Sequence, residues 1–246
     1  MSLLHAGVRS GWRGAAMAAA LLLSAALPSA QAELLYGTTA IGASPRTSDY
    51  GSNTQAGWRS FENFTVAGGG TVQRITWSGL WFGELQPDPA PDPDALSWDI
   101  GFYASTGTAP GAQLSAQNYL TAQVSATFLG TGVLSVNGLY NVSFYQYTVD
   151  LTTPFDVLGG TEYWLSIMAR SEELSPAFAW RAGVGGDDTS YQQLLGAGMS
   201  VVDEFERARD RHVLLEGVFA VPEPGSVLLV ALALGALGVA RRLKIK

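Results

Sequence analysis

Apolar and polar residues alternate through much of the segment between residues 33 and 220, with a period of two rather than 3.6. In the stretch 145–151, Tyr145, Tyr147, Val149 and Leu151 fall on one side and polar residues on the other. Such alternation is typical of a β-strand with one buried face. The stretches of this kind, separated by turn-forming residues, are 61–66, 72–82, 98–104, 123–129, 145–151, 163–169, 177–182 and 213–219. Together they predict an all-β fold.

Because the predicted strands are short and numerous, they favour two packed antiparallel sheets, a jelly-roll-like β-sandwich, over a closed barrel. The charge-rich stretch 201–211 is the one place where a short helix is considered, and a loop is an equal alternative there. Residues 68–70 are predicted to form a flexible hairpin loop, and 159–160 the turn before strand 163–169. No repeat of fixed period is present, so a solenoid or propeller is not expected.

The amino terminus has the features of a secretory signal peptide over residues 1–32. Two arginines precede an apolar stretch, and Ala30 and Ala32 supply the small residues of a cleavage site. Cleavage after Ala32 would leave Glu33 as the mature amino terminus. We therefore predict an exported domain over residues 33–220.

The last segment, 221–246, has three consecutive parts with different chemistry. It begins with Pro222, Glu223 and Pro224, and the prolines lack a backbone donor and fix φ, so they end the preceding structure. A charge-free apolar run follows from 226 to 240. The basic residues Arg241, Arg242, Lys244 and Lys246 come last and are expected to stay cytoplasmic as a stop-transfer signal.

The apolar run is fifteen residues long, whereas a spanning helix usually needs about 20 and at least about 17. Gly225 and the aliphatic stems of the first arginines, which can snorkel to the interface, extend the run toward that lower limit. We therefore predict a short transmembrane helix over about 225–240 and a basic tail over 241–246.

This ordered tail resembles the PEP-CTERM sorting signal, with residues 222–224 as the motif itself. The resemblance implies recognition by an exosortase, a membrane-embedded cysteine transpeptidase-like enzyme of Gram-negative bacteria that also make exopolysaccharide. It further implies a transient inner-membrane anchor with a periplasmic domain, cleavage near the motif, and delivery to the cell surface or extracellular matrix. An ordinary C-terminal anchor is the alternative. The stretches 104–111, 160–167 and 178–180 more loosely resemble exported domains of PEP-CTERM proteins, which implies a surface β-sandwich without a defined catalytic residue.

Charge and residue usage exclude several function classes. Without the six Arg and Lys residues of the two ends, eight cations remain, and without Glu223 twenty acids remain, so the exported domain carries about −12. Such a domain lacks the basic surface that nucleic acid or anionic lipid requires. The chain has no cysteine, which excludes a thiol nucleophile, Cys-ligated zinc and iron–sulfur clusters.

Two acidic loops are candidates for Ca²⁺, which prefers six to eight oxygen ligands. A proline-rich loop offers Asp88, Asp92 and Asp94, and a glycine-rich loop offers Asp187 and Asp188. Neither has the spacing of an EF-hand, and a solvated acidic loop is the simpler interpretation of both. No metal site is assigned, and no other cofactor is predicted.

Tryptophan supplies candidate sugar-binding surfaces, because sugar rings stack on exposed aromatic faces. Trp164, Trp180 and Trp81 are the candidates. Trp164 points away from Tyr163, Leu165 and Ile167 on its strand, so it faces outward if those three face the core. Packing in the core is the simpler interpretation of each tryptophan.

Catalysis has little support in the sequence. His212, the one histidine of the exported domain, lies beside Arg211, and the charges of Arg211 and Arg209 are expected to lower its pKa. No G-x-S-x-G elbow occurs. A glycosidase needs no histidine, only two carboxyls flanking a cleft, and five acids lie in or near predicted strands. These acids are Glu62, Glu84, Asp99, Glu162 and Glu216.

The sequence thus predicts a noncatalytic exported protein of the cell surface or extracellular matrix, sorted by an exosortase and associated with exopolysaccharide. A carbohydrate-binding module is the first alternative, and a secreted carboxylate-pair glycoside hydrolase is the second.

Overall fold

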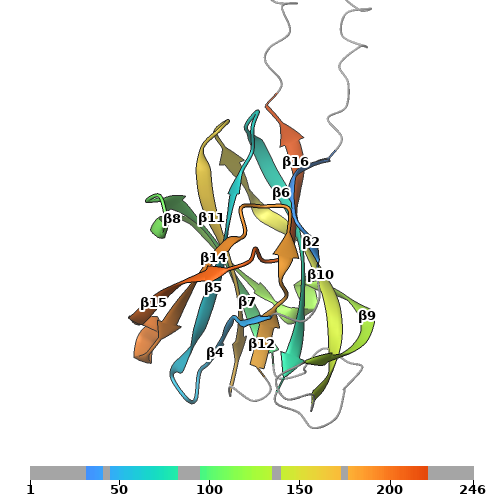
Figure 1. Cartoon of the computed structure of the whole chain (residues 1–246), viewed down its shortest axis with the longest axis vertical. Helices are drawn as coiled ribbons and strands as arrows, with labels where there is room; N and C mark the ends of the chain where they lie inside the picture. Colours follow the sequence, from blue (N-terminus) through green and yellow to red (C-terminus); the bar gives the residue numbers. More distant parts are fainter. Residues whose placement is uncertain (1–31, 41–44, 83–94, 135–139, 173–176, 221–246) are drawn as a thin grey trace, which may run out of the picture. The chain divides into compact units, whose positions relative to one another are not determined.

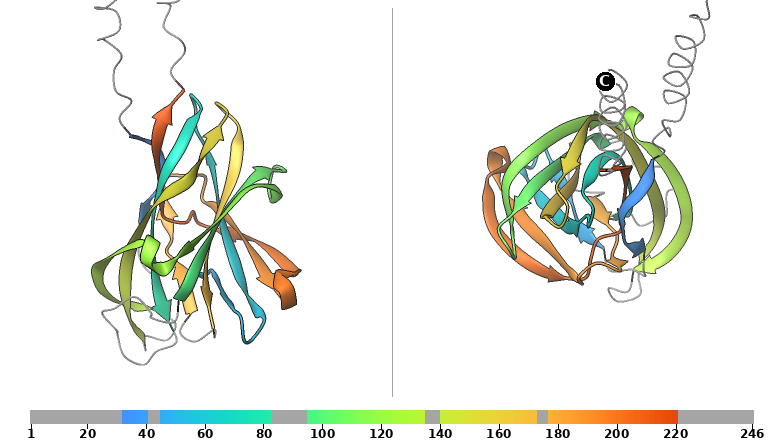
Figure 2. Two further views of the ribbon diagram at one scale, coloured as in Figure 1. Left: turned by 180° about the vertical axis from the view of Figure 1, so that it is seen from behind. Right: turned by 90° about the horizontal axis from the view of Figure 1, so that it is seen from above.

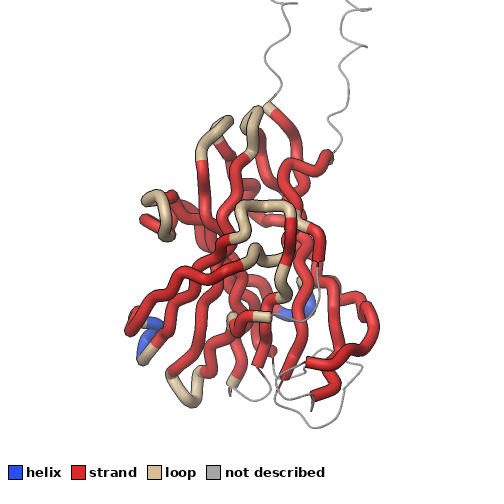
Figure 3. The backbone as a smooth tube through the Cα atoms, viewed as in Figure 1, coloured by secondary structure: helices blue, strands red, loops and turns tan. Residues whose placement is uncertain are grey.

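A computed structural model describes residues 32–40, 45–82, 95–134, 140–172 and 177–220. The predicted signal peptide up to Gln31, the sorting motif, the transmembrane helix and the basic tail lie outside these residues, as does the loop with Asp88, Asp92 and Asp94. The described part is almost entirely strand, with two single-turn 3₁₀ helices, η1 (Thr121–Gln123) and η2 (Ala197–Met199) (Figure 3). The all-β prediction is confirmed.

Two seven-stranded sheets form a sandwich (Figures 1 and 2). The first sheet follows the order β1 (Glu33–Gly37), β16 (Val213–Phe219), β6 (Gly70–Phe82), β10 (Tyr140–Val157) and β9 (Ser125–Leu134), with β12 (Ala177–Trp180) paired to β6 and to β3 (Arg46–Thr47).

The second sheet follows the order β15 (Val201–Ala208), β14 (Thr189–Leu195), β5 (Ala56–Thr65), β4 (Asp49–Gly51), β11 (Glu162–Ser171), β7 (Ala95–Ser105) and β8 (Pro110–Leu120). A short ladder joins β13 (Gly183–Val184) to β2 (Thr39–Ala40). The pairings are antiparallel as predicted, except that β4 runs parallel to β11.

The space between the sheets is filled largely by aromatic side chains. Trp98 of the second sheet packs against Trp77 and Tyr147 of the first, with ring centroids 5.2 and 4.9 Å apart. Phe178 completes the group at 4.8 Å from Trp98. These rings come from four strands, so this cluster fixes the two sheets against one another without disulfides.

The predicted alternation of strand 145–151 is confirmed in β10. Tyr145, Tyr147, Val149 and Leu151 are all buried in the core between the sheets, whereas Asp150 between them is exposed. Strand 213–219 likewise has its predicted bounds as β16. Period-two alternation identifies these strands because one face of each is covered and the other is not.

The glycine-rich turn at 68–70 is not the hairpin loop that the sequence predicts. It leads from β5 in the second sheet to β6 in the first, so the strands that it joins do not pair. Gly69 has a φ of +69°, and a Cβ atom there would lie 2.7 Å from the Gly159 nitrogen. The turn at Leu158–Thr161 also crosses between sheets, from β10 to β11. Two glycine turns therefore pack together where the chain changes sheet.

The stretch 201–211, predicted as a helix or a loop, is largely the strand β15. It pairs along its length with β14, from Val201 opposite Leu195 to Ala208 opposite Thr189. Most of its side chains are exposed, because it lies at the edge of the second sheet. Pairing with a neighbouring strand, rather than local propensity, determines its conformation.

Candidate functional site

A groove of about 300 Å³ lies on the outer face of the second sheet. Its floor contains Gly101 of β7 and Ser166 of β11, which are opposite each other in the strand register. Its other lining residues include Arg59, Asp99, Tyr103, Gln113, Asn118 and Met199. Residues from four strands and η2 meet in this groove, and the sequence pattern alone does not predict it.

The alternation along β7 produces the groove. Ile100 and Phe102 are buried among the core residues between the sheets, so Asp99, Gly101 and Tyr103 project from the opposite face. Gly101 has no Cβ atom, and one added there would lie 2.8 Å from Cε2 of Tyr103. The glycine thus allows the Tyr103 ring to lie over the strand.

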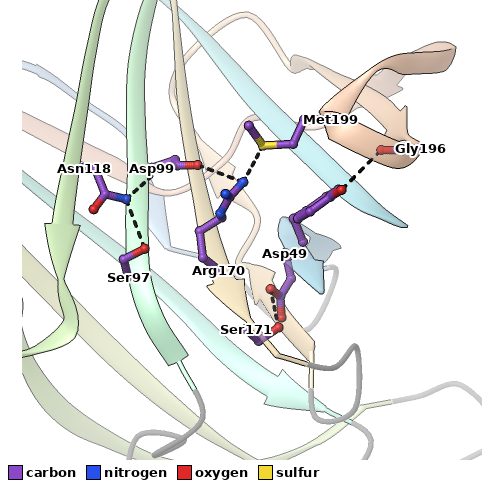
Figure 4. A network of polar contacts seen from close by, with 9 residues as sticks. Asp49, Ser97, Asp99, Asn118, Arg170, Ser171, Gly196 and Met199 are labelled. Atoms are coloured by element: carbon purple, nitrogen blue, oxygen red, sulfur yellow. Dashed lines mark hydrogen bonds and ion pairs between the residues drawn. The ribbon is translucent and has the colours of Figure 1, made fainter. Parts of the chain in front are cut away.

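A polar network holds Asp99 at the edge of the groove (Figure 4). The Asn118 side-chain amide donates to the Asp99 carboxylate over 2.7 Å and to the Ser97 hydroxyl over 3.0 Å. Arg170 forms an ion pair with the other Asp99 oxygen at 3.5 Å, and its guanidinium also contacts the Met199 sulfur. Both Asp99 and Arg170 side chains are about one-third exposed. The carboxylate is therefore positioned in advance yet still reaches solvent.

Ser166 is buried in the groove floor, and its hydroxyl has no hydrogen-bond partner among the described residues. A buried hydroxyl without a partner costs stability, so its presence requires an explanation. A polar ligand or a water molecule in the groove would satisfy it. Because Ser166 also lines the groove, its hydroxyl is positioned to meet such a ligand.

The three tryptophans predicted to stack on sugars do not form such a surface. Trp164 does point away from the core, but it is 1% exposed, because Phe61, Tyr103 and Tyr191 cover it on the outer face. Its indole N–H donates to the Ser105 hydroxyl at 3.3 Å. The prediction for Trp164 as a stacking residue is therefore wrong.

Trp180 and Trp81 belong to the interior. Trp180 is fully buried, and its indole N–H donates to the His212 carbonyl over 2.8 Å, so the stacking prediction is wrong for it as well. Trp81 is partly buried against the core, with its ring 5.6 Å from Phe178 and its N–H bonded to the Tyr147 hydroxyl. Burial and satisfied indole groups leave none of the three available as a free platform.

Glu62 is a second polar feature, but it lies between the sheets. Its carboxylate is fully buried and accepts hydrogen bonds from the Tyr36 hydroxyl and the Arg211 backbone N–H. Burial raises the pKa of the Glu62 carboxyl well above its usual range, and the nearby Asp210 adds to this effect. Burial and Glu62 likewise raise the pKa of Tyr36, and burial lowers the pKa of Arg211 to about 10.

The acids named as hydrolase candidates are not brought together in the described structure. Asp99 lies in the groove and Glu62 lies between the sheets, whereas Glu162 accepts a hydrogen bond from Ser105. Glu216 is half-buried on β16, and Glu84 lies outside the described residues. The groove thus has a single carboxylate among its described lining residues.

The glycine-rich acidic loop is held by hydrogen bonds within the protein. The Asp210 carboxylate accepts from the backbone N–H groups of Gly186 and Asp188 at 2.8 and 2.7 Å. Asp187 accepts from the Asn63 amide at 2.7 Å and from the Thr189 backbone at 2.9 Å. Across the described ranges, no three His, Asp or Glu side chains are grouped to hold a metal ion. These contacts hold the conformation of the loop.

His212 is buried and forms a 2.8 Å hydrogen bond between its Nδ1 atom and the Ser78 hydroxyl. Burial, followed by the charge of Arg181, lowers the pKa of His212 to about 4. The sequence had pointed to Arg211 and Arg209 as the cause of a lowered value. The direction is as predicted, but the main cause is desolvation.

The described domain is thus an all-β sandwich with an outer-face groove. Comparison with known families identifies the tail: residues 220–244 match the PEP-CTERM protein-sorting motif. The chain therefore carries the PEP-CTERM sorting motif that the sequence predicts. This motif implies export, membrane-anchored sorting and processing by an exosortase. No curated protein matches the chain.

The predicted membrane helix is not part of the described structure. Within the described ranges, no helix has the length and apolar character needed to cross a bilayer. The match to the sorting motif therefore carries the assignment of the tail.

Proposed function

We propose that this chain is a noncatalytic protein of the cell surface or extracellular matrix that binds neutral exopolysaccharide in its outer-face groove. An exosortase would deliver it there. The sorting motif supports the route, and the groove supports the ligand class.

The observation that carries this proposal is the arrangement of polar groups around the groove. Asp99 is held by Asn118 and Arg170, and the Ser166 hydroxyl in the groove floor has no partner in the part of the chain that the structure describes. Carboxylate, amide and hydroxyl groups together supply the donors and acceptors that sugar hydroxyls require. Because these groups are already oriented, binding would cost little side-chain ordering.

Charge narrows the ligand class further. The exported domain carries about −12, so a polyanionic polysaccharide would be repelled. A neutral polymer would meet no such barrier.

Hydrolysis is a weaker proposal for the same groove. Glycosidases use two carboxyl groups about 5 to 10 Å apart, one acting as the acid. Asp99 is the single carboxylate among the described groove residues. Binding without cleavage accounts for this lining more simply, and a module of this kind needs no cofactor.

Affinity electrophoresis of the mature chain in gels containing exopolysaccharide from the producing cells tests the proposal. Asn118→Ala removes the amide that orients Asp99 and should weaken retention by about tenfold, which corresponds to about 1.4 kcal/mol. Asn53→Ala, an exposed asparagine in the turn between β4 and β5, is the matched control and should behave as wild type. Equal retention of the two variants would show that the groove does not bind the polysaccharide.

The hydrolase alternative is tested with the same material. Reducing ends should stay constant when the wild-type chain is incubated with the polysaccharide. Release of oligosaccharides by wild type, abolished in Asp99→Asn, would replace the binding function with a catalytic one.

A further inference from the structure

We infer that one end of the sandwich, named here the apolar tip, rests on the lipid surface of the membrane that holds the tail until the exosortase releases the protein. The apolar tip consists of the turns 66–69 and 158–161 and the chain end Phe219–Ala220. This inference rests on the membrane-anchored sorting step and is independent of polysaccharide binding.

The apolar tip combines exposed apolar side chains with an absence of charged residues. None of its residues is charged, although the exported domain as a whole carries about −12. Leu158 is 70% exposed and Phe219 is 37% exposed. Ala67 and Gly68 beside them are also exposed. Exposed apolar side chains at a charge-free end are a surface suited to a bilayer interface.

Hydrogen bonds join the parts of the apolar tip into one unit. The Gly160 N–H donates to the Val66 carbonyl over 3.0 Å, which connects the two turns. The Ala220 N–H donates to the Gly69 carbonyl over 3.2 Å, which fixes the departing chain beside them. Gly70 also lies opposite both Val157 and Phe219 in the strand register. Figure 1 shows the end of β16 beside the two turns at the same end of the sandwich.

The short segment that follows Ala220 identifies the membrane lipid as the surface that the apolar tip contacts. Only residues 221–225 separate Ala220 from the start of the apolar run at Ser226. A chain extends by at most about 3.6 Å per residue, so the membrane-inserted run begins within about 22 Å of Ala220. While the chain is intact, the apolar tip is therefore the end of the domain closest to the bilayer.

A weak contact with lipid is enough to orient the domain while the intact chain tethers it to the membrane. A short tether gives the tip and the lipid surface an effective concentration in the millimolar range. Once the chain is cut, the same small surface would be too weak to hold the protein on the membrane. Asp156 and Glu162 flank the tip, so it should prefer zwitterionic over anionic lipid. The contact would thus orient the domain before cleavage without preventing release.

The absence of cysteine makes a site-specific test direct, because a single introduced cysteine labels one position. The full mature chain would be placed in phosphatidylcholine nanodiscs with an environment-sensitive fluorophore at Leu158→Cys. Leu120→Cys is the matched control, since Leu120 is 61% exposed and lies at the far end of β8. Quenching by aqueous iodide should be slower at position 158 than at 120 by at least about twofold.

The other outcomes overturn the proposal. Equal quenching at positions 158 and 120 would show that the tip does not meet lipid. Protection of position 158 that depends on added exosortase would assign the surface to the enzyme instead. Stronger protection in anionic than in zwitterionic nanodiscs would contradict the charge argument. Retention on polysaccharide should be the same for both labelled chains, which separates this test from that of the groove.

Discussion

The Tyr36 hydroxyl of β1 donates a hydrogen bond of 3.0 Å to the Glu62 carboxylate of β5 and so joins the two sheets. The Arg211 backbone, which lies between β15 and β16, donates to the other oxygen of the same carboxylate. Glu62 is thus a buried acid whose hydrogen bonds connect three distant parts of the chain. Its position indicates a structural role and predicts a specific pH dependence of stability.

Glu62→Gln should reduce the loss of folding stability that occurs as pH rises above about 4.3, which is the ordinary pKa of a glutamate side chain. The folded-state pKa is raised, so between the two values the folded chain holds the proton more tightly than the unfolded chain. The stability that Glu62 contributes is complete at low pH. It falls by up to about 1.4 kcal/mol per pH unit between the pKa of the unfolded chain and the higher pKa of the folded chain. Urea unfolding of the mature protein from pH 4 to 9 measures this slope. The exposed Glu206→Gln is the control, and identical slopes for wild type and Glu62→Gln would contradict the prediction.

His212→Asn should alter the pH dependence of folding stability in the opposite direction to Glu62→Gln. The folded-state pKa is lowered from 6.5 to about 4, so the wild-type chain loses stability as pH falls through this window. The loss is at most about 3.4 kcal/mol, and the variant should lack it. In a chain that begins at Glu33, His212 is the single histidine, so its imidazole proton signal in NMR gives the pKa directly. A midpoint near 6.5 would contradict the buried position.

The strand pattern was predictable because core packing imposes a period of two on the sequence. Val213–Phe219 and the face shared by Tyr145 and Tyr147 were identified on this basis. Strand β15 was not, because its residues have no strongly buried face and depend on pairing with β14. Local sequence cannot reveal a partner that lies elsewhere in the chain.

Trp164 shows a second limit of sequence reasoning. Alternation correctly places its side chain on the face opposite Leu165, but it does not show what covers that face. Phe61 and Tyr103 come from other strands and bury the indole. The groove was missed for the same reason, since Gly101 and Ser166 become neighbours only through the register of β7 and β11. A glycine among outward-facing strand positions was the one local signal available.

Gly101→Ala should weaken binding in the groove. The new Cβ atom would lie 2.8 Å from Cε2 of Tyr103 and must displace its ring, at a cost of about 1 to 3 kcal/mol in stability. We expect about a tenfold loss of retention in exopolysaccharide gels, equal to about 1.4 kcal/mol. Gly68→Ala is the matched control, because its added methyl would approach no closer than 3.8 Å to the nearest side chain. Unchanged retention of Gly101→Ala would show that the Tyr103 position is unimportant for the ligand.

Glu223→Gln and deletion of residues 241–246 should both block delivery without unfolding the sandwich. Both changes lie in the sorting segment, whereas the described core ends with β16 at Phe219. Loss of the glutamate should leave an uncut chain in the inner membrane, because the exosortase would no longer meet its acidic motif. Loss of the basic residues should weaken the stop-transfer signal and mislocalise the chain.

Mass spectrometry of the carboxyl terminus, with immunoblots of membrane and extracellular fractions, would detect both effects. Circular dichroism of the purified variants should retain the β-sheet spectrum of the wild type, and normal surface delivery of both would refute the role of this segment.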